Sequence, residues 1–421
     1  MQKIQLAYGA GSVTFDFDEQ RFTVLALSRQ QEAPLSDIQI GKALDTPIES
    51  PVLDDIFSAG ESVLLVVSDA TRATASAQII NLLVRRLIQI GIAPSDISVI
   101  FATGIHRAVT PAEKQELLTP FIFQRLKTLD HTAADPQQMV MMGTTEQGTP
   151  IELNRALREF SHVVITGAIS FHYFAGFTGG RKSICPGLAS SKAIAATHLL
   201  ALDLENGGRR AGVGPGLLNG NAIHEECEAI AEVINPSFGI NCVVDEKGLA
   251  VRVYAGHWRA AHRIGCLEYI TDHSVRIPNR RDLVIVSCGG SPYDINLIQA
   301  HKALDMAAYA CRDGGTIILL AECAEGLGRQ DFSKWFVEAN SNALESRLRA
   351  AYEVNGQTAW ALMTKTERFR VILVSSLPAN LVEQMRMAPA GSLSEALGAV
   401  QPEAVGYIMP RGAGLLPIAE D

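Results

Sequence analysis

The sequence lacks the long apolar segments that place a protein in or across a membrane. None of its apolar runs reaches the roughly 20 residues that a helix needs to cross a bilayer. The first residues, MQKIQLAYGAGS, also lack the continuous apolar core of a signal peptide. We therefore expect a cytoplasmic protein that does not bind membranes.

Paired cysteines and an excess of positive charge are absent too. The seven cysteines are spread singly without a CxxC pair, which argues against a disulfide framework or a zinc ribbon, so we expect most of them to be buried as small apolar side chains. The 36 Lys and Arg against 45 Asp and Glu give a net charge of −9, which argues against a broad nucleic-acid-binding surface. A local basic pocket for a small anion remains compatible with this charge.

Two nucleotide-binding motifs are also missing. A P-loop requires glycine directly before its lysine, whereas Arg181 precedes Lys182 here. No GxGxxG motif follows a predicted strand, because Gly212, Gly214 and Gly216 have neither the spacing nor the strand. The sequence therefore gives little support to a nucleoside triphosphatase or to a Rossmann-type dinucleotide site.

The length and composition of the chain indicate two globular domains. A chain of 421 residues with 47% hydrophobic and 19% charged residues is typical of ordinary folded cores. The segment PNRR at residues 278–281 separates two regions with strand and helix patterns. We predict an N-terminal domain at residues 1–275, which begins with antiparallel strands in its first thirty residues, and a C-terminal domain at residues 276–421.

Strands and helices alternate in both regions, which predicts two α/β domains with largely parallel sheets. In the first domain, apolar runs at residues 62–68, 96–102 and 162–169 each precede a polar or glycine-rich loop. A capping box with proline at the first helical position, TPAE at residues 110–113, opens one of the helices. The second domain repeats the pattern from residue 282 onward.

Polar side chains follow three of these predicted strands. Asp69 and Arg72 come after the first apolar run, His106 after the second and His172 after the third. Ligands of parallel α/β sheets gather at the carboxyl ends of the strands. We therefore expect these side chains to lie together at one edge of the sheet.

The stretch at residues 165–198 has the composition of a ligand-binding loop. It runs from a short strand through His172, several glycines and the pair Arg181-Lys182 into a helix that contains His198. Glycines let a backbone approach a ligand closely, and a helix N-terminus favours an anion. Lys182 could still be a solvated surface charge rather than a nucleophile or a phosphate ligand.

A structural role is the simpler explanation for most of the other histidines and remains possible for Arg72. That arginine could cap a neighbouring helix or clamp a carboxylate. His106 and His172 differ from the other histidines because both follow buried strands at the same sheet edge. The histidines for which we expect a structural role are His131, His224, His257, His262 and His273.

Four segments together resemble the nickel-dependent lactate racemase family: HYFAGFTGGRKSICPG, SDATRATAS, GIH and NLIQAHKA. The resemblance implies a nickel-pincer nucleotide, a pyridinium mononucleotide whose two sulfur-containing arms help to hold nickel. It implies that Lys182 forms a covalent link to this cofactor and that His198 is the protein ligand to nickel. The enzymes that synthesise the cofactor would be partners of the protein.

The resemblance also implies catalytic and binding roles. His106 and His172 would be the two acid/base residues, and Arg72 would bind the substrate carboxylate with Asp69 nearby. Two residues of the second domain would reach an active-site cleft between the domains, namely Gln299 and Lys302. The remaining implied cofactor contacts are Thr71, Gly179, Gly180 and Arg181.

The implied reaction inverts the α-carbon of a 2-hydroxy acid, either lactate-like or a sugar acid. A histidine would remove the hydroxyl proton while the cofactor takes the α-hydrogen as hydride. We expect tyrosine before the glutamine in lactate-specific members, whereas Ile298 stands there, so the substrate stays open. Two alternatives also stay open: a nicotinamide-dependent 2-hydroxyacid dehydrogenase, and a non-catalytic protein that binds the nickel cofactor.

Overall fold

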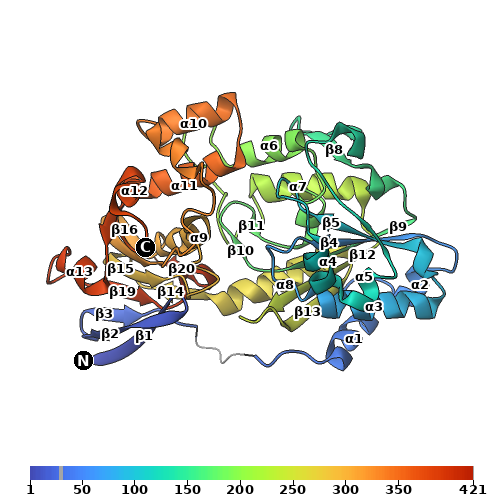
Figure 1. The fold of residues 1–421 in the computed structure, drawn as a ribbon, viewed down its shortest axis with the longest axis horizontal. Coiled ribbons are helices and arrows are strands. Elements are labelled where there is room, and N and C mark those ends of the chain that lie inside the picture. Colours follow the sequence, from blue (N-terminus) through green and yellow to red (C-terminus); the bar gives the residue numbers. More distant parts are fainter. Residues whose placement is uncertain (28–31, 421) are drawn as a thin grey trace. The chain divides into compact units, whose positions relative to one another are not determined.

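The computed structural model describes residues 1–27 and 32–420. Packing divides the chain into two compact units, whose helices and strands are labelled in Figure 1. We call Gln31–Ala201 with Arg210–Tyr269 the glycine-loop unit, and Met1–Gln30 with Leu202–Arg209 and Ile270–Asp421 the terminal unit. Each unit is built around a six-stranded sheet with helices, so the predicted α/β class with largely parallel sheets is confirmed.

The sheet of the glycine-loop unit is parallel except at one edge, where β12 and β13 run antiparallel. The apolar runs predicted at residues 62–68, 96–102 and 162–169 form β4, β5 and β9, which are neighbours in this sheet. The strands in spatial order are β13 (Ala250–Gly256), β12 (Phe238–Val244), β9 (His162–Ala168), β4 (Val63–Ser68), β5 (Ile97–Ala102) and β6 (Lys127–Leu129).

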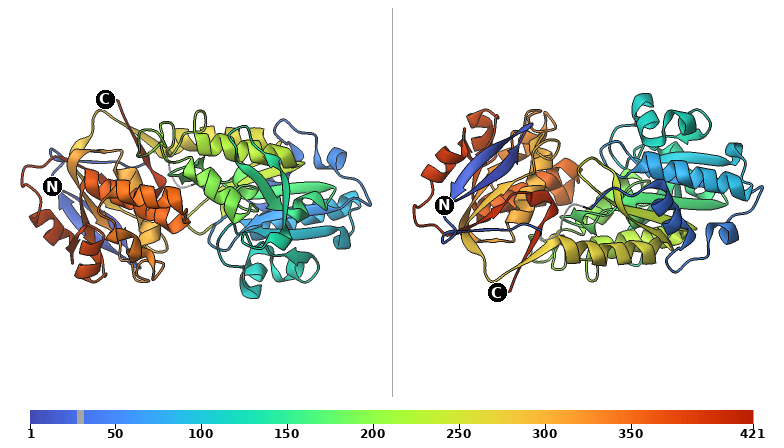
Figure 2. Two further views of the ribbon diagram at one scale, coloured as in Figure 1. Left: turned by 90° about the horizontal axis from the view of Figure 1, so that it is seen from above. Right: turned by 90° about the horizontal axis from the view of Figure 1, so that it is seen from below.

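Helices lie on both faces of this sheet (Figures 1 and 2). Two short antiparallel pairs complete the unit: β7 (Met139–Thr144) with β8 (Pro150–Asn154), and β10 (Phe171–His172) with β11 (Gly176–Phe177). The helices are α1 (Asp37–Asp45), α2 (Leu53–Ile56), α3 (Ser76–Ile90), α4 (Pro111–Leu118), α5 (Pro120–Phe123), α6 (Ser191–Leu199), α7 (Ala222–Ile234) and α8 (Trp258–His273).

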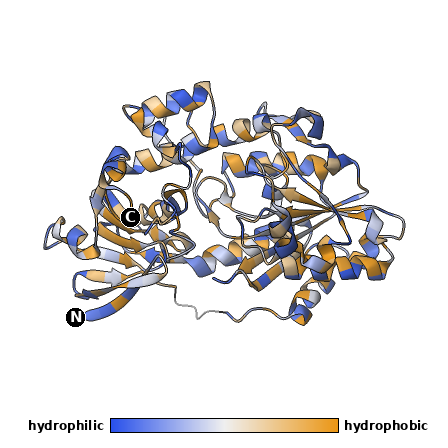
Figure 3. Ribbon diagram, viewed as in Figure 1, coloured by the Kyte–Doolittle hydropathy of each residue, from blue (hydrophilic) through white to orange (hydrophobic). Residues whose placement is uncertain are grey.

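The helices form where apolar residues recur at helical spacing and where end signals are present. In α3, Ile79, Leu83 and Leu87 are all buried at intervals of one turn, and the helix ends at Gly91 with φ 105°. In α4, the capping box predicted at residues 110–113 is present. The strands of both sheets carry the strongest hydropathy (Figure 3), as expected for sheets that are covered on both faces.

The sheet of the terminal unit is parallel throughout its described pairings. Its strands in spatial order are β18 (Ala388–Ala390), β17 (Arg370–Val374), β16 (Cys311–Leu320), β15 (Arg281–Ser287), β19 (Gly406–Met409) and β3 (Phe22–Val24). Beside it lie the antiparallel pair β1 (Gln2–Tyr8) and β2 (Gly11–Phe17), as predicted, and the parallel pair β14 (Ser274–Ile277) and β20 (Leu416–Ala419). The helices are α9 (Leu297–Ala307), α10 (Ser341–Ala350), α11 (Val354–Arg368), α12 (Ala379–Gln384) and α13 (Leu393–Gly398).

The compact units differ from the continuous ranges 1–275 and 276–421 near the N-terminus, at residues 202–209 and at residues 270–275. Near the N-terminus, β3 pairs with β19, and Phe22 is buried in the core of the terminal unit. At residues 202–209, the N–H of Gly208 donates to the Glu345 carboxylate at 2.8 Å, which attaches this segment to α10. Long-range pairing, rather than sequence continuity, therefore decides which residues belong to the terminal unit.

Two expectations about composition can be compared with the structure. All seven cysteines are free and buried, as predicted for small apolar side chains. Among the helices of residues 1–27 and 32–420, none combines the length and the apolar character that crossing a bilayer demands.

Candidate active site

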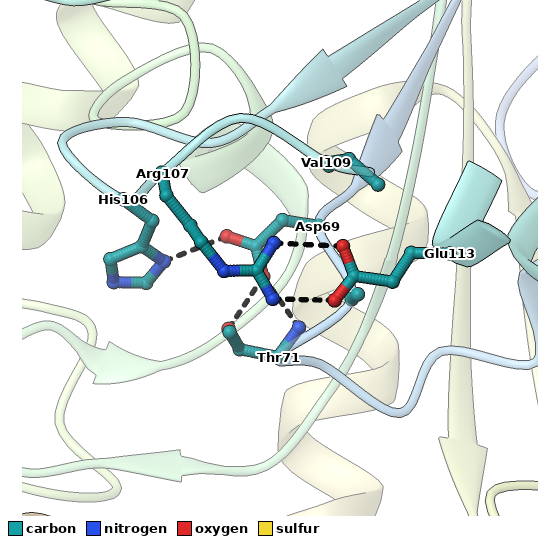
Figure 4. A pocket seen from close by; sticks show the side chains of 7 residues that line it. Asp69, Thr71, His106, Arg107, Val109 and Glu113 are labelled. Carbon is teal, nitrogen blue, oxygen red and sulfur yellow. Dashed lines mark hydrogen bonds and ion pairs between the residues drawn. The ribbon is translucent and has the colours of Figure 1, made fainter. Parts of the chain in front are cut away.

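Two of the predicted residues meet at the carboxyl ends of β4 and β5. Asp69 directly follows β4, and His106 lies in the loop after β5, the neighbouring parallel strand. The Nδ1 atom of His106 is 2.7 Å from Oδ2 of Asp69 (Figure 4). Parallel pairing therefore brings together two side chains that are 37 residues apart in the sequence.

The Asp69 carboxylate is buried and receives hydrogen bonds on both of its oxygens. The N–H of Thr71 donates to Oδ1 at 2.8 Å, and the Thr71 hydroxyl donates to the same oxygen. Burial raises the pKa of Asp69, but the bonds from His106 and Thr71 outweigh this effect and hold the pKa below its ordinary value. An ionised carboxylate only accepts, so His106 donates through Nδ1–H, and in the neutral ring the lone pair lies on Nε2.

The neighbour of His106, Arg107, forms an ion pair that anchors the loop. Its guanidinium donates to both carboxylate oxygens of Glu113, at 2.8 and 2.5 Å, and Glu113 also accepts the Thr110 N–H in the capping box of α4. The hydrogen bond from Arg107 is the largest of the effects that lower the pKa of Glu113 to about 2. The pocket in Figure 4 is lined by Asp69, Ala70, Thr71, His106, Arg107, Val109 and Glu113.

His172 lies in the β10–β11 hairpin and has different hydrogen-bond partners. The backbone N–H groups of Phe174 and Ala175 donate to its Nδ1 at 3.2 and 3.1 Å. Burial, followed by the positive charges of Lys182 and Arg72, holds the pKa of His172 well below its ordinary value. The imidazole is therefore neutral near pH 7, with an acceptor nitrogen at Nδ1.

Lys182 shares the electrostatic environment of His172. Burial holds the pKa of the Lys182 amine well below its ordinary value, and the charges of Arg181 and Arg72 lower it further. His198 is also close enough to contribute to the lowered pKa of His172. The fold thus brings several of the predicted residues of the glycine-loop unit into one polar cluster.

His198 lies in the last turn of α6 and presents one defined nitrogen. Its Nδ1 is 2.9 Å from the carbonyl oxygen of Ile194, which can only accept, so the lone pair lies on Nε2. Burial and the charge of Lys182 lower the pKa of His198 to about 4. Metal-binding histidines commonly donate their other nitrogen to a backbone carbonyl in this way. The N-terminus of α6 is capped by Ser190, whose side chain accepts the Ala193 N–H at 3.2 Å.

Gly179 and Gly180 allow the loop to lie against β12 and α8. Their φ angles are 76° and 54°, and a Cβ would lie 2.7 Å from Oδ1 of Asn241 at the first position and 2.5 Å from the His262 ring at the second. Oδ1 of Asn241 accepts the Gly180 N–H at 2.8 Å. Sequence reasoning missed Asn241, although a polar residue inside the apolar strand FGINCVV was a usable signal.

The guanidinium of Arg181 lies beneath this loop. The side chain is buried and donates to the carbonyl oxygens of Ala175 at 2.6 Å and Gly179 at 3.4 Å. Nη1 of Arg181 also lies 3.3 Å from Nε2 of His262. The predicted contact of Arg181 with a cofactor stays a prediction. Burial is the main cause that lowers the pKa of Arg181.

Two of the histidines expected to be structural are buried and hydrogen-bonded inside the unit. His131 lies 3.2 Å from the Ala189 carbonyl oxygen through Nε2, and its Nδ1 lies 3.1 Å from the Asn154 amide. His262 lies 2.9 Å from the Thr178 carbonyl oxygen through Nε2. Burial lowers the pKa of His131 to about 4 and that of His262 to about 3.

The two predicted residues of the second domain lie on α9 of the terminal unit. Nζ of Lys302 donates to Oε1 of Gln299 at 2.6 Å, and the side chain of Asn296 caps the helix by accepting the Gln299 N–H at 3.0 Å. In the part of the chain that the structure describes, no group of three or more His, Cys, Asp or Glu side chains could hold a metal ion.

Two family models and a curated relative match this chain. The models are described as the lactate racemase N-terminal domain, at residues 8–209, and the lactate racemase C-terminal domain, at residues 277–406. A lactate racemase from Thermoanaerobacterium thermosaccharolyticum is 32% identical over 406 residues, which cover 94% of either chain. The chain belongs to the lactate racemase family.

Other members of the family agree with this assignment. A lactate racemase from Lactiplantibacillus plantarum is 30% identical over 414 residues, again covering 94% of either chain. The solved structure of the lactate racemase apoprotein from T. thermosaccharolyticum superposes with a TM-score of 0.90 at 29% identity, covering 99% of this chain and 100% of that one. The resemblance inferred from the motifs is therefore confirmed, and lactate racemases are isomerases.

Proposed function

We propose that this chain is a 2-hydroxyacid racemase or epimerase, with lactate as the first substrate to test. The observation that carries the proposal is the Asp69–His106 pair at 2.7 Å, because it provides a base for a hydroxyl proton. Arg72, three residues after Asp69, acts together with Lys182 on the pKa of His172. The names of the curated relatives, both lactate racemases, support the same reaction.

We propose a nickel-pincer nucleotide as the cofactor, because the side chains of the glycine loop fit it. The lowered pKa of Lys182 favours the neutral, nucleophilic amine that a covalent link requires. Nε2 of His198 presents a lone pair suited to nickel. A cofactor with its own sulfur arms needs few protein ligands, and when bound it would supply a hydride acceptor. Enzymes that synthesise it would be the partners of this chain.

Each proposed catalytic residue has a task that its surroundings favour. Arg72 would fix the substrate carboxylate, and charged hydrogen bonds of this kind contribute roughly 1.5–3 kcal/mol each. His106 would accept the hydroxyl proton at Nε2, and Asp69 would stabilise the imidazolium that forms. His172 would be the second acid/base residue, because the two enantiomers place their hydroxyl groups differently.

We propose substrate-binding roles for two residues of the terminal unit, Gln299 and Lys302. Ile298 precedes this pair where lactate-specific members are expected to carry tyrosine. A longer 2-hydroxy acid, such as a sugar acid, is therefore the second substrate class to test. The backbone of Gly179 and Gly180 and the side chain of Thr71 remain proposed cofactor contacts.

The path of the α-hydrogen tests the proposed function. Enzyme that contains the cofactor, called loaded enzyme below, should interconvert the enantiomers of α-deuterated lactate in ordinary water. It should largely keep the deuterium, because a hydride does not exchange with solvent. Rapid washout of the label during racemisation would refute hydride transfer and favour direct proton abstraction. Net accumulation of the 2-keto acid with a nicotinamide would instead identify a dehydrogenase, and binding without turnover would identify a non-catalytic cofactor protein.

A further inference from the structure

The short helical turn that carries Lys182 is fixed to the sheet at two points. We call this turn, Gly180–Ser183, the Lys182 turn. The N–H of Gly180 donates to Oδ1 of Asn241 on β12 at 2.8 Å. The hydroxyl of Ser183 donates to the carbonyl oxygen of Thr166 on β9 at 2.9 Å. The two anchoring bonds therefore lie on either side of Lys182 in the sequence.

The two anchoring residues of the sheet lie on neighbouring strands. β12 and β9 pair in parallel, with Asn241 opposite Gly167, the residue after Thr166. The absence of a side chain at Gly167 lets the loop approach, since a Cβ there would lie 3.1 Å from Cα of Gly179. The carboxyl ends of β9 and β12 therefore form one surface on which the Lys182 turn is docked.

Docking buries the Lys182 turn unevenly. Gly180, Arg181 and Ser183 are buried, whereas Lys182 is half-buried. Both backbone groups of Lys182 are bonded within the loop: its N–H donates to the Gly179 carbonyl at 3.2 Å, and its carbonyl accepts the Gly187 N–H at 2.9 Å. The backbone of Lys182 is therefore fixed, while its side chain is the one of the turn that a ligand can reach.

Asn241 uses one of its two polar groups in this docking. The side chain is 1% exposed, and within residues 1–27 and 32–420 its Nδ2 has no hydrogen-bond partner. A buried donor without an acceptor lowers stability. Folding alone therefore does not explain an amide at this position, and the task of the residue rests on the bond that Oδ1 accepts from Gly180.

We propose, on the basis of the proposed cofactor link, that Asn241 is a positioning residue for Lys182: its Oδ1 holds the Lys182 turn on the sheet and so keeps the amine within reach of the cofactor. The link is a condensation. Nζ of Lys182 bonds to an acyl carbon of the cofactor, and one hydrogen of the amine leaves with the hydroxyl of the acid as water, so no oxidant or reductant is needed. Fixing a nucleophile beside its bound partner accelerates such a step.

Hydrogen exchange tests the anchor without cofactor or substrate. In the full chain, the amides of the Lys182 turn should exchange at least about tenfold faster in Asn241→Leu, because the Gly180 N–H loses its acceptor. Asn241→Asp keeps an oxygen for this N–H and should restore slow exchange. Unchanged exchange in Asn241→Leu would overturn the proposal.

Asn235→Leu is the matched control for the exchange experiment. Oδ1 of Asn235 also accepts an N–H in the glycine-loop unit, that of the Trp258 indole at 3.1 Å, but it does not bond to the Lys182 turn. This variant should leave the exchange of the turn unchanged. Equally fast exchange in Asn235→Leu would show a general loosening of the unit and would also overturn the proposal.

Mass spectrometry of protein made together with the cofactor-synthesis enzymes separates positioning from binding. Native spectra detect all bound cofactor, whereas denaturing spectra detect only the covalently linked part. Asn241→Leu should keep bound cofactor in native spectra and show a covalent fraction at least about tenfold smaller in denaturing ones. An unchanged covalent fraction would overturn the proposal. Loss of the cofactor from both spectra would overturn it too, because Asn241 would then act in binding or folding.

These two experiments distinguish failure of this proposal from failure of the proposed function. If the unmodified protein carries no cofactor in either spectrum, the proposed cofactor link fails, and the exchange result still decides whether Asn241 anchors the turn. If Asn241→Leu does not fold, Asn241→Ser takes its place, because a serine hydroxyl is too short to reach the Gly180 N–H. The expected and the contrary results are then the same.

Discussion

His106 and Asp69 form a pair in which the imidazole side chain is 44% exposed and the carboxylate side chain only 6% exposed, with 2.7 Å between Nδ1 and Oδ2. The ring can therefore meet a ligand while its partner stays away from water. Thr71 donates to the other carboxylate oxygen, Oδ1, so Oδ2 is the oxygen that faces His106.

Asp69→Asn should reduce kcat/KM of loaded enzyme by about 10²–10⁴-fold, because an amide cannot stabilise the imidazolium of His106 as a carboxylate does. Initial rates of racemisation measure the effect. Glu113→Gln is the matched control from the same pocket, and its activity should stay close to that of the unmodified protein. Equal activity in Asp69→Asn would remove Asp69 from the proposed machinery.

Lys182→Ala should abolish the covalent mass of the cofactor, whereas His198→Gln should keep the mass and lose most of the nickel. The first variant lacks the amine that would be acylated, and the second lacks the nitrogen that would bind the metal. Intact-mass spectrometry and metal analysis distinguish the two results. Lys192 is an exposed residue of α6, the helix that contains His198, and Lys192→Ala should retain both the covalent mass and the nickel. Full covalent mass in Lys182→Ala would contradict the proposed link.

Gly180→Ala should destabilise the protein by at least about 1–3 kcal/mol, because φ is 54° and the new Cβ would lie 2.5 Å from the His262 ring. Thermal unfolding measures the loss. Gly41→Ala is the contrasting variant: Gly41 is in α1 with no neighbouring heavy atom within 4 Å of a Cβ, so alanine should stabilise by about 0.5–1 kcal/mol. An unchanged melting temperature in Gly180→Ala would show that the loop relaxes away from α8.

Lys302→Ala should impair turnover far more than stability. Its amine bonds to Gln299 on the surface of one helix, and such contacts contribute about 1 kcal/mol or less to folding. Steady-state kinetics and a melting curve on the same protein provide the comparison. Lys334→Ala, which removes a lysine paired with Asp331 and Glu353 in the same unit, should leave turnover unchanged. A large drop in Tm without a kinetic effect would assign Lys302 a structural role.

Stability should fall as the pH is lowered from about 6.5 toward 4. His131 and His262 have folded pKa values of about 4 and 3, below the ordinary value of 6.5, so the unfolded chain takes up protons first in this window. Each such histidine adds a slope of up to about 1.4 kcal/mol per pH unit. Chemical denaturation at pH 7, 6 and 5 measures the slope, and His131→Gln should reduce it. A flat profile would contradict neutral burial of these rings.

The sequence predicted the fold best where the composition of a single segment is enough to indicate a buried strand. The runs that became β4, β5 and β9 are apolar throughout, which only a sheet covered on both faces accommodates, and the parallel order then placed Asp69 beside His106. The capping box of α4 was equally local, because all its hydrogen bonds join Thr110 and Glu113. Periodicity and end signals suffice for features of this kind.

Features that depend on distant segments were not predictable in the same way. The direction of the Arg181 side chain depends on the carbonyl of Ala175 and on His262, which only the folded chain brings within reach. The hydrogen bond from the Gly180 N–H to Oδ1 of Asn241 joins residues that are 61 apart in the sequence. A motif identified Gly180 and Arg181 as important, but it could not separate a residue that supports the loop from one that contacts a ligand.

The pairing of β3 with β19 has a consequence for producing parts of this protein separately. A fragment starting at residue 276 would lack β3, so the strand Gly406–Met409 would become an open edge with unsatisfied N–H and C=O groups. Such edges recruit strands from other molecules and promote aggregation. The C-terminal fragment should accordingly remain monomeric only when the first residues of the chain are supplied, either fused to its end or as an added peptide.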